Sequence, residues 1–192
     1  IMLQSANNAL GTACVAAFTA AARVKMFFMC PYESLGIAMA TYVGQNYGAG
    51  KPERVWQGIK SSVGMMLIYA VFTFTVLMLA SKQVLYLFVD PGETEILKDA
   101  MFYLHVSAIF FPLVGLLCIL RYSIQGAGFT KLSMFSGVAE MIARILVSLL
   151  AVPVWGYTAV CLGDATAWLF ADLFLVPAFY YVYQKIKQIK PA

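Results

Sequence analysis

The residues of this sequence that could do chemistry are charged side chains inside long apolar runs. Four of them are acidic: Glu33, Glu140, Asp164 and Asp172. A buried charge is costly unless it is paired or coordinates an ion. Each of these carboxylates is therefore either part of an ion pair or a site for a proton, a metal cation or an organic cation.

Glu140 and Arg144 are four residues apart, which places them on one face of a helix and within reach of each other. One interpretation is a structural ion pair that fixes helix packing. The other makes Glu140 a titrating site whose proton affinity changes when Arg144 moves.

Asp164, Trp168 and Asp172 recur at intervals of four residues and therefore form one stripe of a helix. Asp172 lies about 12 Å along the helix from Asp164. A carboxylate beside an indole ring can hold a lipophilic cation through charge and the ring quadrupole together. The alternative for Asp164 is a solvated or helix-capping position near the membrane surface.

Pro31 predicts a kink, and Glu33 follows it by two residues, where a bent helix exposes backbone carbonyls. We expect Arg23 and Lys25 to extend toward water or to neutralise acids on neighbouring helices. His105 is expected to make an ordinary polar contact near the outer surface.

Composition identifies the medium that surrounds these groups. Of 192 residues, 62% are hydrophobic and 11% are charged, whereas soluble chains carry about 25% charged residues. Too few charges remain to cover a water-facing globule, so we predict a membrane protein. A net charge of +4, dispersed in apolar sequence, excludes a nucleic-acid-binding face.

Enzyme chemistry has no support in the motifs. The four cysteines have no C-x-x-C pairing, the single His is isolated, and H-E-x-x-H, G-x-S-x-G and phosphate-loop patterns are absent from the sequence. Neither a catalytic residue nor a metal site is therefore predicted, and ATP use is not indicated.

The fold class expected is an all-α, polytopic transmembrane helix bundle, because a span needs about 20 apolar residues. Pro153 and Gly156 supply a turn that divides the last long apolar stretch. The expected elements are a helix tail at 1–10 and five helices at about 12–44, 58–81, 99–123, 132–152 and 158–184.

Loop charges predict the orientation of these spans. Eight basic residues fall on one side and two on the other, which places the eight and the C-terminus in the cytoplasm. The eight are Lys51, Arg54, Lys60, Arg121, Lys131, Lys185, Lys187 and Lys190, and the two are Lys82 and Lys98.

One loop carries the most specific motif of the chain, G-Q-N-x-G-A-G followed by an Arg. Its residues are Gly44, Gln45, Asn46, Gly48, Ala49, Gly50 and Arg54. The glycines permit positive φ and close helix approach, and Gln45 and Asn46 can bond carbonyls left open at a helix end.

This motif resembles a signature of the MATE family of multidrug and toxic compound extrusion transporters. Further matches follow in order: Gln125-Gly-Ala-Gly128, Glu140-x-x-x-Arg144, Gly156-Tyr-Thr-Ala-Val160 and Asp164-Ala-Thr-Ala-Trp168. The resemblance covers essentially the whole chain. It implies twelve helices in two six-helix lobes, of which this chain is the C-terminal lobe and lacks the N-terminal one.

The function implied is secondary active efflux of small organic cations across the cell membrane, driven by an H⁺ or Na⁺ gradient, without any other cofactor. The sodium-coupled branch of the family has an Asp where this chain reads Phe110-Phe-Pro-Leu-Val114. The resemblance therefore implies ion coupling through an acid of the missing lobe.

Two alternatives remain open. A flippase for lipid-linked oligosaccharides, of a related fold, would need a more cationic cavity to hold pyrophosphate. A membrane fragment or subunit that does not itself transport is the other alternative.

Overall fold

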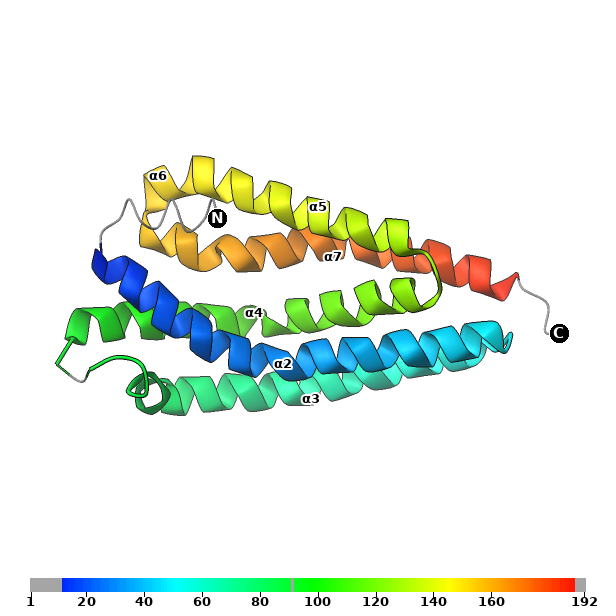
Figure 1. Cartoon of the computed structure of the whole chain (residues 1–192), viewed down its shortest axis with the longest axis horizontal. Helices are drawn as coiled ribbons and strands as arrows, with labels where there is room; N and C mark the ends of the chain where they lie inside the picture. The colour runs from blue at the N-terminus through cyan, green and yellow to red at the C-terminus, as the bar shows by residue number, and fades with distance from the viewer. Residues whose placement is uncertain (1–11, 91, 189–192) are drawn as a thin grey trace. The chain divides into compact units, whose positions relative to one another are not determined.

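The structure is a computed structural model that describes residues 12–90 and 92–188. The helix tail expected at 1–10 lies outside these residues. Helices make up the described chain, and no strand occurs in it (Figure 1). In order they are α2 (Thr12–Gly48), α3 (Pro52–Leu85), α4 (Thr94–Gly126), α5 (Thr130–Leu146), the π-helical segment η1 (Val147–Ala151), α6 (Val152–Trp155) and α7 (Tyr157–Lys187).

Five helical stretches are long and apolar enough to cross a membrane, counting Thr130–Trp155 as one. The chain is thus an all-α, polytopic membrane protein, as the composition predicts. The helices continue past the apolar ranges that the sequence marks: α3, for example, begins at Pro52 with Glu53 in its first turn. Proline is favoured there because the first helical position needs no N–H donor.

Two helices end in the same way, at the first glycine of a G-A-G triplet whose last glycine has a positive φ. Gly50 has φ 63°, and the N–H groups of Gly50 and Lys51 donate to the carbonyls of Tyr47 and Asn46. Gly128 has φ 86° and ends α4 with the equivalent pair of bonds. Both are Schellman caps, in which the residue with positive φ is usually glycine.

The turn expected around Pro153 and Gly156 falls at Gly156, which has φ 54° and separates α6 from α7. Pro153 lies instead in the first turn of α6. The preceding span contains one turn of π-helix, in which the hydroxyl of Ser148 is buried without a hydrogen-bond partner among the described residues.

The chain divides into two compact units, and each is described by itself. Unit 1 comprises Ile1–Cys30, Ala70–Phe111 and Met141–Ala167. Unit 2 comprises Pro31–Tyr69, Pro112–Glu140 and Trp168–Ala192. Two of the chain boundaries between them fall at prolines inside helices, Pro31 in α2 and Pro112 in α4, where a backbone N–H donor is missing.

Small residues allow α2 and α4 to approach closely in unit 2. A Cβ added to Gly126 would collide with the carbonyl of Ala40 and lie 2.8 Å from its Cα. A Cβ added to Gly44 would lie 3.1 Å from the carbonyl oxygen of Gly126. Because lipid does not force helices together as water does, such backbone proximity is a main source of packing energy in membranes.

The close approach predicts that Gly126→Ala destabilises the protein by about 1–3 kcal/mol, the usual effect of overpacking. Gly137→Ala is the matched control, because a Cβ at Gly137 meets nothing within 4 Å. Thermal unfolding of the two variants in detergent, followed by fluorescence-detected size exclusion, should lower the midpoint for Gly126→Ala alone. Equal midpoints would show that the α2–α4 contact does not need glycine.

Candidate functional site

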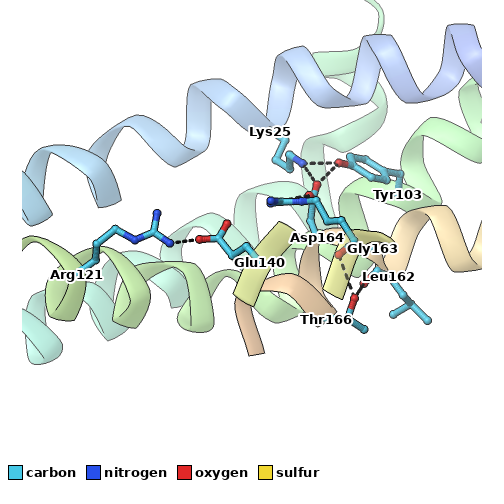
Figure 2. Close-up of polar contacts among 9 residues, drawn as sticks. Lys25, Tyr103, Arg121, Glu140, Leu162, Gly163, Asp164 and Thr166 are labelled. Carbon is cyan, nitrogen blue, oxygen red and sulfur yellow. Dashed lines mark hydrogen bonds and ion pairs between the residues drawn. The ribbon is translucent and has the colours of Figure 1, made fainter. Parts of the chain in front are cut away.

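Unit 1 contains a cluster of three polar side chains around the carboxylate of Asp164 (Figure 2). The ammonium of Lys25 donates to Oδ2 of Asp164 and to the hydroxyl of Tyr103. The Tyr103 hydroxyl donates to the same Oδ2 at 3.0 Å. Arg144 donates to the other oxygen, Oδ1, at 3.3 Å.

The cluster is held by four helices, α2, α4, α5 and α7, and most of it is removed from water. The side chains of Lys25 and Asp164 are 10% and 14% exposed, and Arg144 is 35% exposed. Phe18 packs edge-on against the Tyr103 ring at 5.1 Å, and the Lys25 ammonium lies 5.0 Å from that ring centroid. An aromatic face and a carboxylate together compensate the lysine for its lost hydration.

Two sequence-based alternatives are decided by this geometry. Lys25 neutralises an acid of a neighbouring helix, as one interpretation had it, and does not extend to water. Asp164 is not a cap or a solvated group, because α7 begins at Tyr157 and the Asp164 side chain is buried two turns further on.

The acids and bases of unit 2 include a second ion pair. Arg121 of α4 donates through Nη2 to Glu140 of α5 and through Nε to Ser136 at 2.9 Å (Figure 2). Gln125 donates to Ser133 at 2.7 Å, one turn further along the same two helices. Glu140 thus forms an ion pair with Arg121, and Arg144 forms one with Asp164.

Asp172 of α7, also in unit 2, differs from these ion-paired residues. Its side chain is 5% exposed, and neither carboxylate oxygen has a hydrogen-bond partner in the described part of the chain. The positive charge of Arg121 interacts electrostatically with the Asp172 carboxylate, and the Asp172 charge interacts with the Cys118 thiol. Trp168, one turn before it on the same face, is 3% exposed and belongs to the packed interior of this unit.

The remaining predicted residues lie apart from these groups. Glu33 is exposed on α2 within unit 2. His105 makes the expected polar contact, with Nε2 3.0 Å from the Ser81 hydroxyl in unit 1. The predicted stripe is divided, since Asp164 belongs to unit 1 and both Trp168 and Asp172 belong to unit 2.

The G-Q-N-x-G-A-G motif forms a helix end in unit 2. Gly44, Gln45, Asn46 and Gly48 lie in the last turns of α2, Ala49 and Gly50 form the turn, and Arg54 is exposed in the first turn of α3. Backbone N–H groups satisfy the open carbonyls, whereas the Asn46 side chain donates to the Tyr42 carbonyl at 2.8 Å. Tyr42 in turn donates to the Arg54 carbonyl at 3.1 Å, which ties α2 to α3.

Sequence reasoning missed Tyr103 and Arg121. Arg121 was counted with the loop charges, although it lies within the helix expected at 99–123 and within α4, and its pairing with Glu140 was not predicted. Tyr103 carries no signal of its own, because one tyrosine in an apolar span is equally suited to packing or to the membrane interface.

Five helices long enough to cross a membrane, with buried ion pairs and a buried carboxylate that has no hydrogen-bond partner among the described residues, define a polytopic membrane protein. The MatE family model matches residues 2–150, which is more than half of the chain. The chain therefore belongs to the MatE family. The comparison with curated proteins found no match.

Solved structures of transporters share its fold. One is a MOP superfamily transporter from Pyrococcus furiosus, for which a binding pocket of reverse polarity has been taken to indicate a different function: 19% identity, TM-score 0.83. Another is an inward-facing multidrug resistance MATE family transporter of the MOP superfamily: 20% identity, TM-score 0.79. A third is a MATE in the bent conformation: 21% identity, TM-score 0.81. Each match covers 96% of this chain, and the chain spans 40–42% of the length of the matched structures.

The cluster in unit 1 predicts unequal effects of removing its members. Asp164→Asn leaves Lys25 and Arg144 without their carboxylate and should destabilise the protein by about 3–5 kcal/mol, as breaking a buried ion pair does. Lys25→Met leaves the Arg144–Asp164 pair intact and should cost much less. Thermal unfolding in detergent measures both, and an equal or larger loss for Lys25→Met would contradict the assignment of Asp164 as the shared partner.

Proposed function

We propose that this chain is the C-terminal lobe of a two-lobe transporter that exports small organic cations, multidrug substrates included, by antiport with H⁺ or Na⁺. The missing N-terminal lobe and the lipid bilayer are its partners. We place the protein in the cell membrane, with several spans and a cytoplasmic C-terminus. Family membership and the shared fold support a transporter, and the finer assignment rests on the residues discussed next.

The observation that carries the proposal is the unpartnered carboxyl of Asp172. A buried acceptor without a donor costs about 1–3 kcal/mol, and more when it is charged. Because Asp172 is buried within its own unit, another lobe is not needed to account for its loss of water. A carboxyl kept in this state is suited to take up a proton or a cation during the transport cycle.

Transport then follows from competition for the acidic site. The coupling ion and an organic cation both neutralise the carboxyl, so binding of one excludes the other. If each favours a different orientation of the two lobes, the ion gradient drives the substrate outward by alternating access.

One observation favours the flippase as a second candidate. The cluster in unit 1 brings two cations, Lys25 and Arg144, to one carboxylate, and Arg23 is exposed on the same stretch of α2. An excess of positive charge at membrane depth suits an anionic substrate such as a pyrophosphate-linked lipid. A pocket of reverse polarity has been described for the Pyrococcus furiosus transporter of similar fold.

The proposal predicts that Asp172→Asn reduces gradient-driven efflux of a dye cation at least about tenfold, because the neutral amide cannot exchange a proton or a cation. Glu33→Gln should reduce it as well. Glu53→Gln is the control, since Glu53 lies in the first turn of α3, outside the charge-free stretch of that span. The assay uses the full-length protein in vesicles, with a pH gradient and a sodium gradient applied separately.

Unchanged efflux in both Asp172→Asn and Glu33→Gln would remove these residues from the mechanism. Transport of a polyprenyl pyrophosphate in place of the dye would favour the second candidate.

The orientation predicts which single cysteines a membrane-impermeant maleimide reaches. In a background without the native cysteines, cysteine at Gly92 should react in intact cells, and cysteine at Lys51 should react only after the membrane is opened. The opposite pattern would invert the topology without affecting the fold.

A further inference from the structure

An apolar groove of about 230 Å³ runs along unit 2 between α3, α4 and α7. It begins at Trp56 and Tyr183, whose rings lie 5.4 Å apart. It continues past Ile59, Leu120 and Phe179 and reaches Leu116 and Val176. Tyr183 and Val176 are seven residues apart on α7, so the groove follows the helix for about 10 Å.

The walls of the groove combine buried and accessible side chains. Ile59, Leu120 and Phe179 form its floor, with exposed fractions of 4–5%. Trp56, Val176 and Tyr180 form its rim and are 42–64% exposed. This mixed aromatic and aliphatic lining is suited to a flexible hydrocarbon chain, since most of its surface needs no hydrogen bond.

Positive charge gathers at the aromatic end of the groove. The Lys187 ammonium lies 4.9 Å from the ring centroid of Tyr183, and the Lys185 ammonium lies 5.8 Å from that of Tyr181. Arg54 and Lys60 are exposed on the same stretch of α3 and add positive charge to this end of unit 2. Glu53 is the acidic residue in this stretch of α3, so basic residues outnumber acidic ones at this end of unit 2.

We propose that the groove binds one anionic phospholipid, with an acyl chain along Ile59, Phe179 and Val176 and the phosphate beside Lys187. Charge complementarity selects the occupant. Basic groups at the end of an apolar path between membrane helices match a negative headgroup followed by a hydrocarbon chain. Because the same basic residues belong to the side assigned to the cytoplasm, the lipid comes from the inner leaflet, where anionic lipids attract them. This site does not depend on which substrate is transported.

The test uses the full-length protein, purified in detergent with equal amounts of phosphatidylglycerol and phosphatidylcholine and examined by native mass spectrometry. Phosphatidylglycerol should be retained in preference to phosphatidylcholine. Its apparent dissociation constant should rise at least about fivefold in Lys185→Gln/Lys187→Gln, since each basic group near an anionic surface contributes about 1 kcal/mol.

Two pairs of variants separate the site from general attraction. Val176→Phe fills the groove at a half-exposed position and should weaken retention, whereas Val154→Phe, at an exposed position of α6, should not. Lys51→Gln removes a charge that follows α2 and should leave retention nearly unchanged. All comparisons are made on the monodisperse fraction of each variant.

Equal retention of the two lipids would overturn the proposal, and so would equal losses in Lys51→Gln and Lys185→Gln/Lys187→Gln. A cross-link from cysteine at Tyr180 to the preceding lobe would overturn it as well, because the rim would then be covered by protein. Failure of the efflux assay would leave this result unaffected, since lipid retention is measured without transport.

Discussion

The cost of placing a charge in an apolar medium is the constraint on which the rest of this molecule depends. In unit 1 this cost is offset by contacts between helices. Asp164 is contacted by Lys25, Tyr103 and Arg144, one from each of three other helices. Breaking these pairs would leave a buried charge uncompensated, so the cluster fixes the helices with respect to one another as it neutralises the charges. It brings two cations, Lys25 and Arg144, to one carboxylate.

In unit 2 the cost of burying charge is only partly offset by ion pairing. Arg121 and Glu140 neutralise each other, and the Ser136 hydroxyl accepts a further hydrogen bond from Arg121. Asp172 is buried on α7 without a partner among the described residues. The two aspartates of α7 thus differ in their surroundings: Asp164 is ion-paired, whereas Asp172 has no hydrogen-bond partner in the described residues.

Backbone proximity is the second source of order, and it depends on small residues. Where α2 and α4 meet in unit 2, Gly44 and Gly126 let the backbones approach in a way that no other side chain permits. Gly50 and Gly128 end the same two helices with positive φ. The G-A-G triplets therefore act first on architecture, and the neighbouring basic residues of α3 give that end of the unit its charge.

The surrounding membrane, the helical class and the number of spans in the described chain could be predicted from the sequence. Hydrophobic length and charge are properties of one segment and do not depend on its contacts with other segments. The sequence also identified the acids worth examining. The sequence could not show that Glu140 pairs with Arg121, or that Lys25 and Arg144 share Asp164. Residue spacing identifies only contacts within one helix, between residues three or four positions apart. The contact of Tyr103 with Asp164 could not be predicted for the same reason. Which charges are matched and which is left over depends on how separate helices are rotated and packed, and only the tertiary structure decides that.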